Sequence, residues 1–104
     1  MQVGKYKVRD GLSKFMYQRV QITLADAAGI GSNRAYYDAA MESAPYMIEG
    51  GEGVPPLERC KIAGVTCIRV NPDWLAENLD IDDAMQILNE CLRASEVTEQ
   101  EVKN

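Results

Sequence analysis

The most reactive side chains in this chain of 104 residues belong to three cysteines, Cys60, Cys67 and Cys91, and the chain has no histidine. The cysteines are seven and twenty-four positions apart, which matches no close-paired zinc or redox motif, so we expect reduced, partly buried thiols. Without histidine the chain lacks the commonest metal ligand and the commonest proton carrier at neutral pH. The sequence therefore predicts no enzyme, no metal site and no cofactor; a lone cysteine nucleophile is the catalytic alternative that stays open.

Three aspartates, Asp80, Asp82 and Asp83, form the densest group of potential cation ligands. An EF-hand calcium loop needs glycine at its sixth position and glutamate at its twelfth, where this chain has Met85 and Cys91. Paired carboxylates that act in acid–base catalysis need an enclosing pocket, whereas these residues stand at polar positions of an expected helix. Neither calcium binding nor carboxylate catalysis is predicted.

The segment GIGSNR at residues 29–34 precedes an expected helix and is a candidate anion site. Backbone N–H groups at such a helix start can bind phosphate. The segment is not the dinucleotide fingerprint, because arginine occupies the third glycine position and no strand-turn-helix unit surrounds it. A plain turn between two elements is the other interpretation. On the anion-binding interpretation the contributing residues are Gly29, Gly31, Ser32 and Arg34.

The elements that would position these groups are clearest between Asn71 and Ser95. Asn71 is a good N-cap, Pro72 suits the first helical position and Asp73 favours the positive end of the helix dipole, so a short helix should begin at Pro72. Asp80 predicts the cap of a second, longer helix. Apolar residues recur along this helical pair at helical spacing, and they form either core or a surface that contacts a partner chain. The members of this apolar stripe are Trp74, Leu75, Ile81, Met85, Leu88 and Leu92.

The N-terminal residues predict a β-hairpin. Val3, Tyr6 and Val8 lead into Asp10-Gly11, a dipeptide typical of tight hairpin turns. The apolar run over residues 15–24 would then form the returning strand. Residues 12–20 also fit a helical pattern, so this segment is either strand or helix.

The middle of the chain predicts a helix followed by a loop. Ser32 or Asn33 should cap a helix over residues 34–43, and Pro45 should stop it. Residues 49–58 contain three glycines and two prolines, which is typical of a surface loop.

A second hairpin over residues 59–70, with Ala63-Gly64 as its turn, would join directly to the Asn71 cap. Together these segments predict an α+β fold, a small domain over residues 1–95 with one or two hairpins packed against three to four helices and a C-terminal helical pair. Residues 96–104 form either a polar tail or an extension of the last helix.

Charge and composition limit the class of partner. The chain has 11 basic and 16 acidic residues, a net charge of −5, and a hydrophobic fraction of 46%. An acidic protein without a dense basic stripe is poorly suited to a nucleic-acid backbone, so no nucleic acid is expected. No apolar run is long enough for a membrane span and no secretory signal follows Met1. We therefore expect a cytoplasmic protein that does not bind membranes.

The segment WLAENLDIDDAMQILNECLRASEVTEQE, within residues 71–101, resembles small proteins of tailed phages, most of all the tail assembly chaperones. The similar pattern is a tryptophan or leucine, an acidic turn, an aliphatic helix and a polar tail. The resemblance implies a non-enzymatic protein that covers an aggregation-prone tail component in the host cytoplasm, with the apolar stripe as its contact face. A homo-oligomer is a further expectation.

Three functions follow from these observations. We expect a phage tail assembly or structural accessory protein that acts through protein–protein contacts. The first alternative is a regulatory or inhibitor module whose acidic end, with nine acidic residues from Asp73 onward, binds a basic host protein. The second alternative is a small anion-binding domain that uses the GIGSNR turn.

Overall fold

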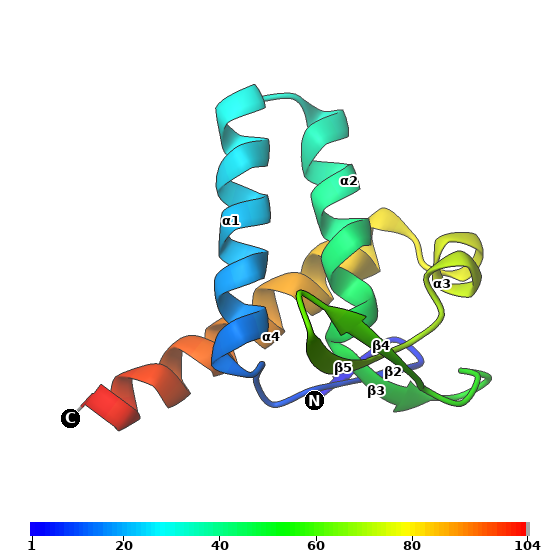
Figure 1. Cartoon of the computed structure of the whole chain (residues 1–104). Helices are drawn as coiled ribbons and strands as arrows, with labels where there is room; N and C mark the ends of the chain where they lie inside the picture. The colour runs from blue at the N-terminus through cyan, green and yellow to red at the C-terminus, as the bar shows by residue number, and fades with distance from the viewer. Residues whose placement is uncertain (104) are drawn as a thin grey trace.

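A computed structural model describes the backbone of residues 1–103 and the side chains of residues 1–96. Within that part of the chain there are four α-helices, one 3-10 helix, a three-stranded antiparallel sheet and a two-stranded antiparallel sheet (Figure 1). The predicted α+β class with a C-terminal helical pair is confirmed.

The three-stranded sheet joins the N-terminus to the middle of the chain. β1 (Gln2–Val3) and β2 (Tyr6–Val8) form a hairpin around Gly4-Lys5, and β3 (Ile48–Gly51) pairs with the other side of β2. Gly51 has a φ of +140°, and a Cβ at this position would overlap the carbonyl oxygen of Lys5. Only glycine therefore allows β3 to come this close to the first hairpin.

The predicted turn at Asp10-Gly11 and the returning strand over residues 15–24 are wrong, because Lys14–Ile30 forms the helix α1. The helical alternative for residues 12–20 is the correct one. The Ser13 hydroxyl caps this helix by accepting a hydrogen bond from the N–H of Met16 at 3.2 Å. Apolar residues follow at helical spacing, and the ones that α1 buries are Met16, Tyr17, Val20 and Ala27.

Two helices form an antiparallel pair that projects from the body (Figure 1). α1 ends at Gly31, which has a left-handed φ of 75°, and α2 (Asn33–Ser43) begins two residues later. The predicted Ser32 cap is confirmed, since its hydroxyl accepts a hydrogen bond from the N–H of Ala35 at 3.1 Å. The predicted stop is confirmed as well, and the 3-10 helix η1 (Ala44–Tyr46) follows α2.

The predicted second hairpin is confirmed, with β4 (Glu58–Ile62) and β5 (Val65–Arg69) on either side of Ala63-Gly64. Both turn residues have positive φ, 50° for Ala63 and 81° for Gly64, as a two-residue hairpin turn of type I′ requires. The predicted loop over residues 49–58 is wrong at both ends, because its first residues belong to β3 and its last residue to β4.

The predicted caps of the C-terminal helices are confirmed. The Asn71 side chain accepts hydrogen bonds from the N–H groups of Asp73 and Trp74, both at 3.0 Å, at the start of α3 (Pro72–Asn78). The Asp80 carboxylate accepts a hydrogen bond from the N–H of Asp83 at 2.8 Å, at the start of α4 (Ile81–Lys103). For residues 96–104 the sequence predicts either a polar tail or a helix extension, and the backbone of residues 96–103 follows the helix extension as part of α4. Residue 104 lies outside the described residues.

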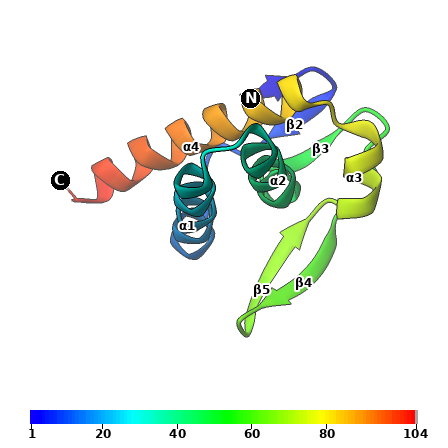
Figure 2. The ribbon, with the colours of Figure 1, turned by 90° about the horizontal axis from the view of Figure 1, so that it is seen from above.

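The core forms where α4 crosses α2 and the three-stranded sheet (Figures 1 and 2). A buried Ser95 fastens α4 to the segment before α1: its hydroxyl accepts a hydrogen bond from the N–H of Leu12 at 2.9 Å and donates one to the carbonyl of Cys91 at 2.8 Å. The largest fully buried apolar side chains include Tyr6, Met47, Ile48, Leu75 and Ile87.

In the described part of the chain, no helix is long and apolar enough to cross a membrane.

Candidate functional site

The members of the predicted apolar stripe lie on α3 and α4, and most of them face the core. Leu75 is 0% exposed and Leu88 is 3% exposed, so in this conformation neither side chain can reach a partner. Ile81, at 40%, is the exposed member, while Trp74, Met85 and Leu92 are half-buried against the core. The buried face of α4 also includes Ile87, which the prediction omitted and which is 0% exposed. Binding through the stripe stays a prediction, and the side chains that it can use are the exposed and half-buried ones.

The residues next to Trp74 belong to the N-terminal hairpin. The Lys5 ammonium lies 5.5 Å from the ring centroids of both Tyr6 and Trp74. Tyr6 is buried, and its hydroxyl has no hydrogen-bond partner among the described residues. Burial, followed by the charges of Asp83 and Asp80, raises the pKa of Tyr6. Tyr6 is therefore a core residue whose hydroxyl remains neutral.

The GIGSNR segment has local structural roles in this fold. Gly31 ends α1, the Ser32 hydroxyl caps α2, and the Arg34 guanidinium pairs with the Asp38 carboxylate at 3.1 Å. Gly29 is an exposed residue of α1. Anion binding here stays a prediction, with the hydroxyl and the guanidinium already engaged within the chain. Among the described residues, no three His, Cys, Asp or Glu side chains gather as they would around a metal ion.

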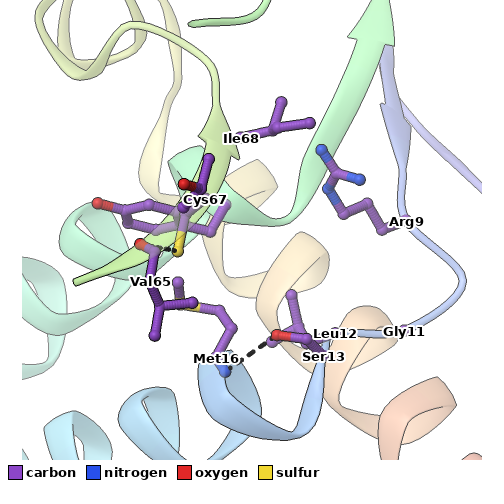
Figure 3. Close-up of a pocket in the computed structure, with 10 residues that line it drawn as sticks. Arg9, Gly11, Leu12, Ser13, Met16, Val65, Cys67 and Ile68 are labelled. Atoms are coloured by element: carbon purple, nitrogen blue, oxygen red, sulfur yellow. Dashed lines mark hydrogen bonds between the residues drawn. The ribbon is translucent and has the colours of Figure 1, made fainter. Parts of the chain in front are cut away.

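A groove that the sequence did not predict lies between β5 and the start of α1 (Figure 3). Its volume is about 320 Å³. One wall consists of Arg9, residues 11–13 and Met16, and the other consists of Val65–Ile68. Tyr46 of η1 lines the groove between these walls. The groove is therefore made by segments that are far apart in the sequence.

Polar contacts at the base of the β4–β5 hairpin position this second wall. The Arg69 guanidinium pairs with the Glu58 carboxylate at 3.0 Å and donates a hydrogen bond to the Tyr46 hydroxyl at 3.3 Å. The bond to Tyr46 is the main reason why the pKa of Arg69 is raised. The N–H of Val70 donates to the carbonyl of Pro45 at 3.0 Å. The hairpin is thus attached to η1, with β5 on the side of the groove.

The edge of β5 inside the groove is unpaired, since β4 is its only neighbouring strand in the described part of the chain. Ile62 and Val65 flank the two-residue turn and form a hydrogen-bonded pair. Hydrogen-bonded and non-hydrogen-bonded pairs alternate along an antiparallel ladder, so Thr66 and Ile68 belong to non-hydrogen-bonded pairs. Their N–H and C=O groups therefore point away from β4. Val65 and Ile68 also expose 41% and 46% of their surface. This edge can therefore offer both backbone hydrogen bonds and apolar contacts.

Arg9 supplies the charge at the groove. It is half-buried, and its guanidinium makes no hydrogen bond or ion pair with the described residues. In Figure 3 its side chain points toward Ile68. A carboxylate could pair with this guanidinium in a charge-assisted hydrogen bond. The chemistry of the groove thus suits an extended peptide that carries apolar side chains and a carboxylate.

Comparison of the chain with protein-family models, with curated proteins and with solved structures yields no match. The resemblance of residues 71–101 to tail assembly chaperones stays a prediction.

Proposed function

We propose that this chain is a non-enzymatic protein-binding domain whose groove receives an extended segment of a protein partner as an added strand on β5. The observation that carries the proposal is an unpaired strand edge that lines a groove. Strand addition gains affinity from main-chain hydrogen bonds and specificity from the pockets that receive alternate side chains.

The properties of the groove indicate the kind of segment that it would bind. Thr66 and Ile68 would hydrogen-bond its backbone, while the exposed side chains of Val65 and Ile68 would contact its apolar residues. A carboxylate of the segment would pair with Arg9. The partner segment is therefore an extended strand. It has apolar side chains at alternate positions and a carboxylate at one end.

We propose that this binding serves the assembly of a phage tail and that the partner is a tail component. The C-terminal resemblance to tail assembly chaperones supports this proposal. Co-expression with the tape-measure protein encoded in the same genome tests it: this chain should keep that protein soluble and co-purify with it. If the tape-measure protein is equally insoluble with and without this chain, that role is wrong.

The groove itself is tested by removing one outward N–H from each side of the same hairpin. Thr66→Pro removes a donor from the groove edge of β5, and Lys61→Pro removes the equivalent donor from the opposite edge of β4. Neither N–H contributes to the β4–β5 ladder, so both variants should fold. The probe is a short synthetic peptide of alternating valine and threonine with a free C-terminal carboxylate. Fluorescence anisotropy should show about tenfold weaker binding to Thr66→Pro and unchanged binding to Lys61→Pro.

A second pair of variants tests the charge. Arg9→Gln should weaken binding of the same peptide, whereas Arg93→Gln, which changes an exposed arginine on α4, should not. Bound peptide should also slow amide hydrogen exchange at Thr66 and Ile68. Equal binding to both proline variants, or protection of amides away from β5, would contradict strand addition at this groove.

A further inference from the structure

The β4–β5 hairpin places Cys60 directly opposite Cys67. Residues directly opposed in an antiparallel pair point to the same face of the sheet. Both cysteines are half-buried and neither is in a disulfide, while Cys91 is fully buried in the core. The cysteine spacing alone gave no pairing motif, but the turn at Ala63-Gly64 sets a register that makes these two residues partners.

The geometry of this pair permits a covalent bond. Ile62 and Val65 form the hydrogen-bonded pair that flanks the turn, and the alternation of the ladder makes Cys60 and Cys67 another hydrogen-bonded pair. The Cα atoms of such a pair are about 5.5 Å apart, within the range of roughly 4.4–6.8 Å that disulfides span. The Cβ atoms of a hydrogen-bonded pair lie farther apart than in a relaxed disulfide, so the bond would be strained and easily reduced.

We propose that Cys60 and Cys67 form a reversible cross-strand disulfide, a redox site on the hairpin that reacts with a low-molecular-weight disulfide such as oxidised glutathione. Cys67 lines the groove, where such a molecule can reach it (Figure 3). Its Sγ donates a weak hydrogen bond to the carbonyl of Val65 at 3.6 Å, a contact that a small rotation of the side chain can break.

The reaction proceeds by two thiol–disulfide exchanges. The Cys67 thiolate attacks one sulfur of oxidised glutathione and expels one glutathione thiolate, which leaves a mixed disulfide on Cys67. The Cys60 thiolate then attacks the Cys67 sulfur and expels the second glutathione thiolate. The two cysteine protons pass to the two glutathione thiolates. The protein is oxidised by two electrons, and one oxidised glutathione becomes two reduced molecules.

Mass spectrometry of the native chain after incubation with oxidised glutathione tests the proposal. The intact protein should lose the mass of two hydrogen atoms, and two of its three thiols should no longer react with iodoacetamide. Trypsin cuts after Arg59, Lys61 and Arg69, so the digest should contain the peptide Cys60-Lys61 linked to Ile62–Arg69. An excess of reduced glutathione should restore both thiols.

The variant Cys60→Ser is the matched control, because it removes the second attack and keeps the first. It should stop at a mixed disulfide on Cys67, with the mass of one bound glutathione. The proposal is overturned if the native chain also stops at that adduct, or if the digest links either cysteine to Cys91. The result is independent of the proposed function, because neither measurement involves a peptide or protein partner.

Discussion

Ser95 is the residue through which the C-terminal helix holds the N-terminal segment in place. Its buried hydroxyl is bonded both to the N–H of Leu12 and to the carbonyl of Cys91. Ser95→Ala would leave the N–H of Leu12 without its acceptor, which costs about 1–2 kcal/mol, while the better helix propensity of alanine returns about 0.5 kcal/mol. We expect a net loss of about 1 kcal/mol in urea denaturation, with faster amide exchange at Leu12. Unchanged exchange at Leu12 would contradict the role of this hydroxyl.

Cys91 makes the stability of the protein depend on pH in the alkaline range. Burial raises the pKa of its thiol from 9.0 to about 11. Because the folded state holds this proton more tightly than the unfolded state, the contribution is fully present below pH 9. It is lost as the pH rises from 9 to 11, at a cost of up to about 3 kcal/mol.

Chemical denaturation of the native chain and of Cys91→Ala at several pH values between 8 and 11 measures this contribution. Because the raised pKa of Tyr6 also makes stability depend on alkaline pH, the difference between the two proteins isolates the thiol. The free energy of unfolding should fall more steeply with pH for the native chain. Parallel curves would show that Cys91 does not titrate on unfolding.

Among the elements, the β4–β5 hairpin has a turn residue that is poorly suited to its backbone. Ala63 has a φ of 50°, and a left-handed conformation costs a residue with a Cβ about 1–2 kcal/mol. Asparagine tolerates this conformation, and Asn-Gly is the preferred pair in such turns. Ala63→Asn should therefore stabilise the hairpin by about 0.5–1 kcal/mol. Slower amide exchange along β4 and β5, with the rest of the chain unchanged, is the expected result, and faster exchange would refute it.

The elements that the sequence predicted correctly are those whose signals are local. Ser32, Asn71 and Asp80 each cap a helix within three residues of their own position, and the Ala63-Gly64 turn fixes its own hairpin. For residues 15–24 the sequence favours a strand because their apolar side chains have high strand propensity, whereas the spacing within residues 12–20 supports the helical alternative that the structure adopts. β3 was assigned to a loop because its pairing with β2 is long-range and its glycines resemble a turn.

The groove was missed for the same reason as β3. Its walls are formed by residues far apart in the sequence, Arg9 with residues 11–13 and Val65–Ile68, and the hairpin is held beside η1 by the hydrogen bond from Arg69 to Tyr46. The apolar stripe was predicted from helical spacing, which shows that a helix has an apolar face but does not show what covers it. In this fold the chain itself covers Leu75 and Leu88.

The whole molecule has a core that draws on both ends of the chain. Val3 and Val8 of the first sheet belong to the same buried cluster as Ile87 and Cys91 of α4. Leu88→Asp would therefore place a charge in this core and unfold the protein, so it cannot report on self-association. Homo-oligomer formation stays a prediction, and the substitutions that test it belong at exposed apolar positions such as Ile22, which is 62% exposed.

Truncation tests whether residues 1–95 are sufficient for this fold. Ser95 is the last buried residue among the described side chains, and the residues before it complete the core. A chain that ends after Ser95 should keep its cooperative thermal transition, with a Tm within a few degrees of the full chain's, as expected for a loss of less than about 1 kcal/mol.

The matched truncation ends after Glu90 and removes Cys91, Leu92 and Ser95 together. It leaves a gap in the core where α4 meets the first sheet and deprives the N–H of Leu12 of its acceptor. These losses together amount to several kcal/mol, a large part of the stability of a domain of this size, so the shorter chain should show no cooperative transition. Equal melting of the two truncated chains would show that the contact between α4 and the N-terminal segment contributes little to folding. A shorter chain that is unfolded beside a stable longer one would place the end of the folding unit between residues 90 and 95.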